Sequence, residues 1–275
     1  MLYALKLTVI ALVTVPLALL TTVLGLLDPH GKHVYRINQL WSWLILRIAG
    51  ISLKIAGLNH IDPAKKYIFM VNHQSNIDIP VLITGLSQFQ LRWIAKKELL
   101  WVPFFGWAMW ASKHITVDRT NPLGAAKTLQ RAKERIAAGI SVVVFPEGTR
   151  SRDGELLRFK KGGFRLAVET GTAIVPVTIN GSGALLPSGA WRLRPGTIEV
   201  TLGQSITGEG YQPGNLRALA EEVRERIAEH LRPVAGPPAE TIPSASSSPA
   251  SATGRISLGL TRAKKRLGAH KIFLT

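Results

Sequence analysis

The first 58 residues are the most apolar part of the chain. Residues 7–27 are 21 consecutive uncharged residues, dominated by Leu, Val and Ala. A helix of this length can cross a hydrocarbon core of about 30 Å, so the segment predicts a membrane span. Two alternatives are a secretory signal peptide flanked by Lys6 and a kinked or re-entrant hairpin at Pro16.

A second apolar stretch, residues 35–58, follows. Its cations Arg36, Arg47 and Lys54 are spaced by 11 and 7 residues, which would place them within about 20° of each other on a helix. A narrow cationic stripe on a helix rich in Leu, Ile and Trp is typical of the bilayer interface. The alternative is a helix packed against the protein core. We expect residues 1–58 to be two membrane-anchoring helices, and their basic residues favour a cytosolic position for the domain that follows.

From about residue 59, short apolar runs alternate with amphipathic stretches. We expect strands at 67–72, 91–95, 114–118, 141–145, 173–179 and 197–203, and helices at 78–87, 122–138, 162–170 and 214–231. This alternation predicts an α/β domain over residues 59–233, with a mixed, largely parallel sheet flanked by helices.

The last segment, residues 234–275, has a different composition. It begins rich in Pro, Ser and Ala and ends with six Lys or Arg residues between 255 and 271. We expect a disordered linker followed by a basic tail. The tail either docks on anionic lipid as an amphipathic segment or remains solvated.

The chain is strongly basic and contains no cysteine. Its net charge is +17, which favours nucleic acid, anionic lipid or a phosphorylated ligand as partner. The cations are shared among the apolar segments, the strand ends and the tail, without the aromatic interleaving of a nucleic-acid-binding module. We therefore expect no nucleic-acid partner. The missing cysteine excludes disulfides, thiolate metal sites and cysteine nucleophiles.

One histidine and one aspartate stand out at the end of the first expected strand, in the run NHQSNID. His73 and Asp78 are about 140° apart on a regular helix, so they meet only across a strand-to-helix turn. A histidine oriented by a carboxylate is a common general base. A metal site is less favoured, because no further His or Cys cluster completes the coordination. We predict a proton-transfer pair and no metal.

The run FPEGTRS follows the strand expected at 141–145. Gly148 allows the backbone to approach a ligand, Thr149 adds a hydroxyl, and Arg150 offers a planar cation for phosphate. Glu147 is suited to accept a hydrogen bond from a ligand hydroxyl. The run is not a P-loop. A salt-bridged surface turn is the alternative interpretation.

Further cations occur where other strands end, among them Lys96 in AKKEL and Arg119 in ITVDR. Ligands of open α/β sheets bind beyond strand ends. Several of these cations are therefore expected to converge on one anionic site, although each alone is more typical of a solvated surface charge.

Five blocks in this order, NHQSNID, AKKELLWVPFFG, ITVDR, FPEGTRS and IVPV, make the chain similar to the glycerolipid acyltransferase family. The match is nearest to its 1-acylglycerol-3-phosphate acyltransferase members and covers roughly residues 60–205. The ITVDR block departs slightly from the family's usual form. It reads KHITVDR here, where the family often has Gly and an apolar residue before Ile-Asp-Arg. The departure lies directly before Arg119, the residue of that block with an implied role.

The resemblance implies acyl transfer from acyl-CoA or acyl-carrier protein to the free hydroxyl of a lysophosphatidate, without a cofactor. It implies His73 as general base and Asp78 as its orienting partner. Binding roles are implied for Lys96, Arg119 and Arg150 at the phosphate, and for Glu147 and Gly148 in the acceptor pocket with Thr149 beside them. Pro176 lies in the last block, and no specific role is implied for it.

Three alternatives stay open beside this expectation. The same chemistry could act on glycerol 3-phosphate, another lysophospholipid or a lyso-aminolipid. Ser75 could be a nucleophile, although a thioester is already activated and no G-x-S-x-G elbow is present, so direct attack is favoured. Finally, the chain could bind anionic membrane lipid without catalysis.

Overall fold

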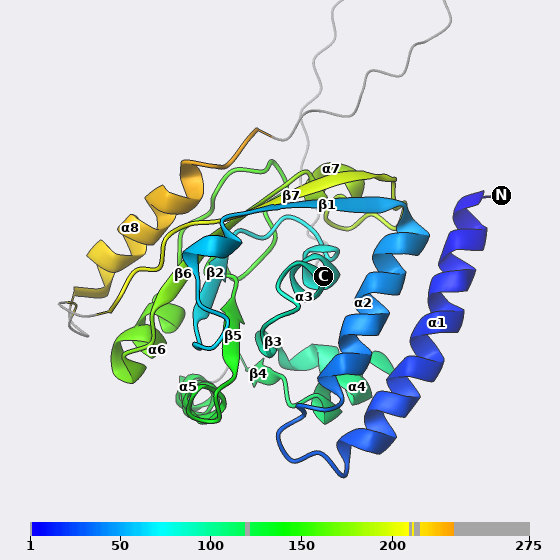
Figure 1. Ribbon diagram of the computed structural model, residues 1–275, viewed down its shortest axis with the longest axis horizontal. Helices are drawn as coiled ribbons and strands as arrows, with labels where there is room; N and C mark the ends of the chain where they lie inside the picture. Colours follow the sequence, from blue (N-terminus) through cyan, green and yellow to red (C-terminus); the bar gives the residue numbers. More distant parts are fainter. Residues whose placement is uncertain (1, 119–121, 209–210, 212–214, 234–275) are drawn as a thin grey trace, which may run out of the picture. The chain divides into compact units, whose positions relative to one another are not determined.

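The computed structural model describes residues 2–118, 122–208, 211 and 215–233 (Figure 1). The described residues all belong to one compact unit. The expected linker and basic tail, 234–275, lie outside the described residues, as does Arg119.

The described residues form one seven-stranded sheet in the order β1-β7-β6-β2-β5-β3-β4. All neighbouring strands are parallel except β6 and β7. This confirms the expected mixed, largely parallel sheet. The strands are β1 (Ile51–Ala56), β2 (Ile68–Val71), β3 (Leu91–Lys96), β4 (Ile115–Val117), β5 (Ser141–Val144), β6 (Ile174–Asn180) and β7 (Gly196–Leu202).

Helices cover both faces of the sheet (Figure 1). They are α1 (Leu2–Gly25), α2 (Tyr35–Ala49), α3 (Asp78–Gly85), α4 (Phe105–Ala111), α5 (Pro122–Ala137), α6 (Gly162–Thr170), α7 (Ser182–Leu185) and α8 (Leu216–Ala228), with 3₁₀ turns η1 (Leu58–His60) and η2 (Lys97–Trp101). The six strands and four helices expected after residue 59 are all present. Their ends lie within three residues of the expected positions.

The central strand β2 shows why both faces need cover. Phe69 and Val71 belong to the apolar cluster that includes α2 and α3. Ile68 and Met70 point to the opposite face and pack with residues of α5, α6 and α8. A strand buried on both faces reads as a continuous apolar run, and this is the sequence of β2.

The expected helix over 35–58 is wrong in its second half. Helix α2 ends at Ala49, and Gly50 closes it with a left-handed φ of 75° and backbone hydrogen bonds to Arg47 and Leu46, a common helix stop. Residues 51–56 then form β1, the edge strand paired in parallel with β7. Lys54 therefore lies on a strand, and the three-cation helical stripe does not exist.

Helix α2 also packs on the core rather than standing apart from it. Its buried residues are Tyr35, Ser42, Ile45, Leu46 and Ala49, and it contacts α3. The core-packed alternative for this stretch is therefore what the structure has. A two-helix membrane segment is not confirmed.

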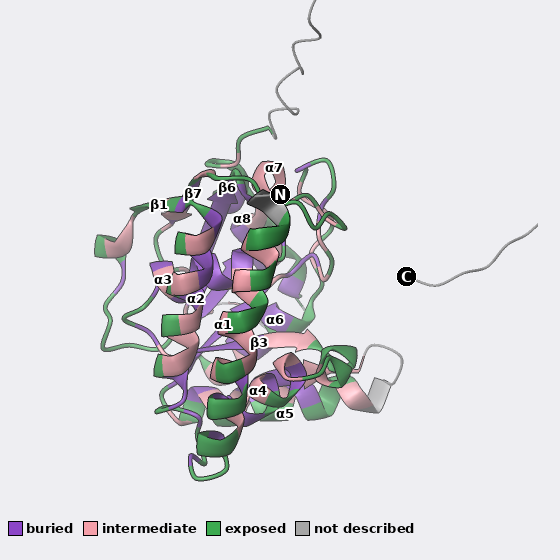
Figure 2. Cartoon of the chain, turned by 90° about the vertical axis from the view of Figure 1, so that its right-hand side faces the viewer, coloured by how far each residue is buried: buried purple, intermediate pink, exposed green. Residues whose placement is uncertain are grey.

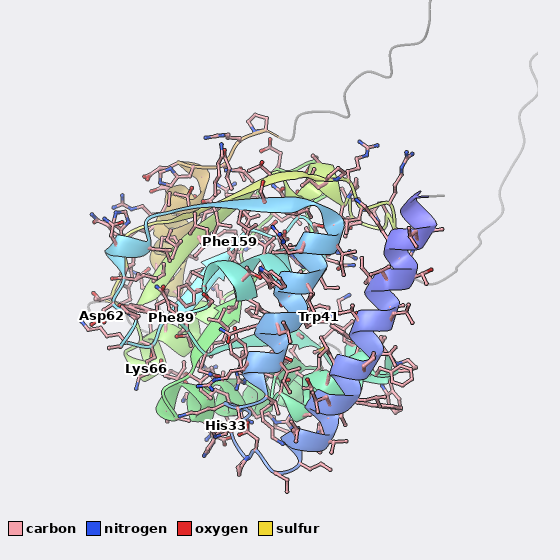
Figure 3. All side chains as sticks on the ribbon, turned by 45° about the vertical axis from the view of Figure 1, so that its right-hand side comes forward. His33, Trp41, Asp62, Lys66, Phe89 and Phe159 are labelled. Atoms are coloured by element: carbon pink, nitrogen blue, oxygen red, sulfur yellow. The ribbon has the colours of Figure 1, made fainter. Side chains whose placement is uncertain are left out.

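Helix α1 lies against the outer side of α2. Trp41 of α2 lies on the side that faces α1 (Figure 3), and its indole Nε1 donates a 3.0 Å hydrogen bond to the Thr14 hydroxyl of α1. The helix continues through Pro16, so no hairpin forms there. Much of its outer surface is exposed and apolar (Figure 2). Among the described residues, α1 is the one helix long and apolar enough to cross a membrane.

Candidate functional site

The expected site residues gather at one edge of the sheet. Strands β2, β5 and β3 are adjacent and parallel, so their carboxyl ends share an edge. His73 follows β2, the 145–151 loop follows β5, and Lys96 ends β3. This is the edge at which open α/β sheets bind their ligands.

The turn between β2 and α3 brings His73 to Asp78. The Nδ1 atom of His73 lies 2.8 Å from the Oδ2 atom of Asp78. The same oxygen accepts the backbone N–H groups of Gln74 and Ser75, both at 2.9 Å. The Asp78 side chain is completely buried, and that of His73 is 16% exposed. The backbone of the turn thus fixes the Asp78 carboxylate, and the carboxylate in its place orients the His73 ring.

Asn72 anchors the start of this turn to the neighbouring strand. Its amide group donates to the Ile179 carbonyl at 2.9 Å and accepts the Ile179 N–H at 2.7 Å. This two-way bond is sequestered from solvent, because Asn72 is buried. It joins β2 to β6 at the point where the ladder ends, so the chain leaves the sheet in a defined direction.

The loop after β5 holds His73 on three sides. The Phe145 ring stacks on the imidazole, with centroids 3.9 Å apart and planes 16° from parallel. Glu147 Oε1 accepts the backbone N–H of His73 at 2.9 Å. The Ser151 N–H donates to the His73 carbonyl at 2.8 Å. Backbone and ring are both positioned before any substrate arrives.

Glu147 is a buried brace between two loops. Its second oxygen, Oε2, accepts the N–H of Leu157 at 3.1 Å, and the residue is 3% exposed. Burial raises the pKa of its carboxyl, while the bonds from His73 and Leu157 act in the opposite direction. The described contacts of Glu147 are therefore with backbone. Its expected contact with a ligand hydroxyl stays a prediction.

Gly148 and its neighbours form the outer rim of the loop. Gly148 has a left-handed φ of 73°, which favours glycine. A Cβ there would lie 2.7 Å from the ammonium nitrogen of Lys160. Thr149 is exposed. Arg150 Nη1 donates to the Asn76 side-chain oxygen at 3.0 Å, so the FPEGTRS loop is joined directly to the NHQSNID turn.

Lys96 lies farther along the same edge. It is exposed at the end of β3, and β5 separates that strand from β2. Two inter-strand spacings amount to about 10 Å. A ligand bound between the ends of β2 and β3 would therefore lie within reach of the long Lys96 side chain. Pro176 lies within β6 and pairs with Met70 of β2, so it is part of the sheet beneath the site.

Two other expectations can be compared with the structure. The Ser75 hydroxyl donates to the Leu186 carbonyl at 2.6 Å and is buried, an arrangement that ties down a loop rather than presenting a nucleophile. In the part of the chain that the structure describes, no group of three or more His, Cys, Asp and Glu side chains could hold a metal ion.

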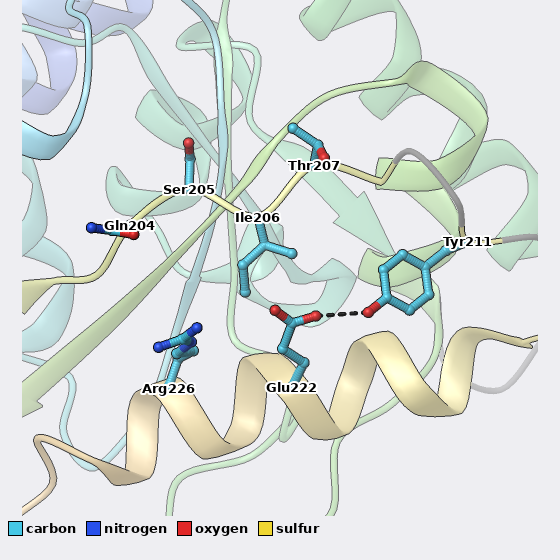
Figure 4. Close-up of a pocket in the computed structure, with 7 residues that line it drawn as sticks. All are labelled: Gln204, Ser205, Ile206, Thr207, Tyr211, Glu222 and Arg226. Atoms are coloured by element: carbon cyan, nitrogen blue, oxygen red, sulfur yellow. Dashed lines mark hydrogen bonds between the residues drawn. The ribbon is translucent and has the colours of Figure 1, made fainter.

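A hollow of about 290 Å³ lies elsewhere, beside α8 (Figure 4). It is lined by Gln204, Ser205, Ile206, Thr207, Tyr211, Glu222 and Arg226. Ile206 forms a β-bridge with Ile174, the first residue of β6. The hollow is therefore near the amino end of β6, whereas His73 lies at the carboxyl end of the neighbouring strand β2. It is separate from the site.

The sequence did not single out three residues that shape the site. Phe145 stacks on the imidazole, Asn76 receives Arg150, and Ser151 binds the His73 carbonyl. All three lie inside the two quoted motifs, so their nearness to the site was foreseeable. Their contacts were not, since these depend on how the two loops meet.

Comparison with known proteins agrees with this geometry. A family model described as Acyltransferase matches residues 52–180. The 1-acyl-sn-glycerol-3-phosphate acyltransferase of Pseudomonas aeruginosa is 38% identical over 180 residues, which are 65% of this chain and 67% of that protein. The 1-acyl-sn-glycerol-3-phosphate acyltransferase alpha of Ovis aries is 31% identical over 208 residues, which are 74% of this chain and 72% of that protein.

A chloroplast relative and a solved structure extend the comparison. The Arabidopsis thaliana protein LPAT1 is 33% identical over 75% of this chain, which spans only 56% of that longer protein. The crystal structure of PlsC, the 1-acyl-sn-glycerophosphate acyltransferase of Thermotoga maritima, superposes with a TM-score of 0.69 at 26% identity. The superposed region covers 83% of this chain and 94% of the Thermotoga maritima chain.

Proposed function

The chain belongs to the 1-acyl-sn-glycerol-3-phosphate acyltransferase family, and we propose that it transfers an acyl chain to the sn-2 hydroxyl of a lysophosphatidate to make phosphatidate. The observation that carries this proposal is the His73–Asp78 pair, held at 2.8 Å at the carboxyl edge of the sheet. The reaction is a step of phospholipid synthesis.

His73 acts as the general base. Its Nδ1 atom is engaged by Asp78, which leaves Nε2 to take the proton from the acceptor hydroxyl. The hydroxyl oxygen attacks the thioester carbonyl carbon, a C–O bond forms and the C–S bond breaks. The proton held by His73 passes to the departing thiolate. Asp78 stabilises the imidazolium that forms between these two proton transfers.

Cations at the sheet edge bind the acceptor phosphate. Arg150 presents a guanidinium beside the NHQSNID turn, and Lys96 is exposed at the end of β3. Together they suit a phosphate monoester more than a neutral headgroup. Arg119 is a third candidate, outside the described residues. Gly148 and Thr149 border the same loop and contribute close backbone approach and a hydroxyl.

The acyl donor is acyl-CoA or acyl-carrier protein, and no cofactor is needed because the thioester is already activated. The enzyme works at a membrane, since both lipids are apolar and α1 offers an exposed apolar helix. The basic residues that follow α1 favour a cytosolic position for the sheet domain.

A three-acceptor assay tests the proposal. The purified full chain in detergent micelles would receive oleoyl-CoA with lysophosphatidate, glycerol 3-phosphate or lysophosphatidylcholine. We expect phosphatidate to form with a kcat/KM at least tenfold above either rival. Preference for a rival would keep the mechanism and change the acceptor. No transfer to any acceptor from oleoyl-CoA or from oleoyl-acyl-carrier protein would refute the enzymatic function and favour simple lipid binding.

A further inference from the structure

An exposed aromatic surface lies directly after Lys96 in the chain. Within the twelve residues 99–110, five large apolar side chains are exposed, which we call the Trp surface: Leu99, Trp101, Val102, Trp107 and Trp110. Trp101 is 83% exposed, and Trp107 and Trp110 are about half exposed, at 48% and 54%. Adjacent large apolar side chains on a surface mark a place of interaction.

The local fold presents these side chains outward. A Cβ at Gly106 would collide with the Leu100 carbonyl, so glycine there allows η2 to fold back closely onto α4. Met109 and Ala111 form the buried side of α4, whereas Trp107 and Trp110, three residues apart, share its exposed side. The exposed tryptophans are therefore a consequence of how α4 packs.

The helix α4, which carries Trp107 and Trp110, packs against α1. A Cβ on Gly25 of α1 would lie 2.7 Å from the Ala111 Cβ of α4, and Asn38 of α2 donates to the Ser112 hydroxyl at 2.9 Å. Figures 1 and 2 both place α4 beside one end of α1. The candidate membrane helix and the Trp surface are thus fixed against each other.

The flanking charges identify the partner. Lys96, Lys97 and the exposed Glu98 precede the surface, and the Lys97 ammonium lies 3.7 Å from the Asp118 carboxylate. The Lys113 ammonium follows the surface, 4.8 Å from the centre of the Trp110 ring. Tryptophan with neighbouring lysine is the composition of the bilayer interface, where the indole sits at headgroup depth and the cation meets anionic lipid. A protein partner would more often meet a surface poor in lysine.

We propose that the Trp surface is a second lipid-docking element beside α1, which inserts Trp101 and Trp107 into the headgroup boundary of an anionic bilayer. Docking there fixes Lys96 at headgroup depth, because η2 begins at the next residue. A lysophosphatidate could then reach the sheet edge with its acyl chain still in the bilayer, a consequence that rests on the proposed function.

Single-cysteine labelling tests the docking without reference to catalysis. The chain has no native cysteine, so Trp101→Cys and Trp107→Cys each give one labelling position. Glu225→Cys is the matched control, because Glu225 is exposed on α8, which packs with α6 and β6 rather than with α4. Each labelled full chain would be reconstituted in phosphatidylglycerol–phosphatidylethanolamine vesicles that contain phospholipid with a nitroxide on its acyl chain.

We expect strong nitroxide quenching at positions 101 and 107 and little at 225. Equal quenching at all three positions, or a blue shift at 101 without quenching, would overturn the proposal, the latter because a protein and not lipid would cover the surface. In parallel, the Trp101→Ala, Trp107→Ala double variant should lose at least fivefold in transfer to bilayer lysophosphatidate and keep its rate on short-chain lysophosphatidate in detergent. If the wild type transfers nothing, the proposed function fails while the quenching result still decides the docking.

Discussion

The His73 imidazole and the Asp78 carboxylate are five positions apart in the chain and meet across a turn, with Nδ1 and Oδ2 2.8 Å apart. Two backbone N–H groups bind the same oxygen, so the carboxylate is immobilised before it contacts the ring. This arrangement favours the tautomer of His73 with its proton on Nδ1, in which Nε2 is the nitrogen able to accept a proton.

Replacing Asp78 by Asn keeps the shape and removes the negative charge. The Asn oxygen would keep the Oδ2 position, where the backbone N–H groups of Gln74 and Ser75 donate, so the imidazolium formed during proton transfer would lose its counter-charge. We expect Asp78→Asn to lower kcat by about 10²–10⁴ with KM for lysophosphatidate changed less than threefold. Steady-state kinetics would check this. A variant with near wild-type kcat would show that the carboxylate charge does not stabilise the imidazolium.

Glu147 should affect catalysis by positioning His73, and it should also stabilise the fold by joining two loops. In Glu147→Gln, one of the two backbone N–H groups would face an NH₂ group and lose its acceptor, at a cost of about 1–3 kcal/mol. We expect lower stability to denaturant and a lower kcat. Glu155→Gln, at an exposed position in the same loop, is the control and should change neither. Full activity of Glu147→Gln would refute its role in positioning His73.

Arg150 should matter more for binding than for the chemical step. A guanidinium hydrogen bond to phosphate is worth about 1.5–3 kcal/mol, so Arg150→Ala should raise KM for lysophosphatidate by about tenfold or more. The neighbouring exposed Arg152 supplies the control, since Arg152→Ala keeps the same net charge as Arg150→Ala. Equal KM values for the two variants would assign the effect to general charge rather than to a bound phosphate.

His114 makes the fold sensitive to acid. Burial, with Arg92 and Arg135 nearby, lowers its pKa to about 3, and its Nδ1 accepts the Trp93 N–H at 3.3 Å. In the unfolded chain the group binds a proton below about pH 6.5. The stability it contributes is therefore complete above pH 6.5 and is lost as pH falls toward 3.

The variant His114→Gln removes this titration and keeps an acceptor for Trp93. Its unfolding free energy should fall less than that of wild type between pH 7 and pH 4.5, as measured by denaturant unfolding at each pH. Parallel curves for the two proteins would show that His114 is not held neutral in the folded state.

The sequence predicted the sheet well and the N-terminal region poorly, for a physical reason. Runs such as 67–72 are apolar at every position, which suits a strand buried on both faces. The apolar stretch 35–58 is compatible with a helix or with a strand, and the helix stop at Gly50 divides it into one of each. Only the pairing of β1 with β7, about 145 residues apart, decides that the second half is a strand.

The site shows the same limit. The motifs identified His73, Asp78 and Arg150 by residue type and order. The brace by Glu147 and the stacking by Phe145 depend on the approach of two loops more than 70 residues apart. Local pattern carries no information about such contacts. Short elements such as α4, with seven residues, also escape because they have too few turns to show a period.

The central claim is that His73 is the base for acyl transfer to lysophosphatidate, and His73→Ala tests it most directly. Wild type and variant, both confirmed as folded by circular dichroism, would be compared in single-turnover transfer from oleoyl-CoA to lysophosphatidate in detergent. We predict that phosphatidate formation falls by about 10² or more, with lysophosphatidate binding retained. Equal rates in the two proteins would remove His73 from the mechanism and contradict the account.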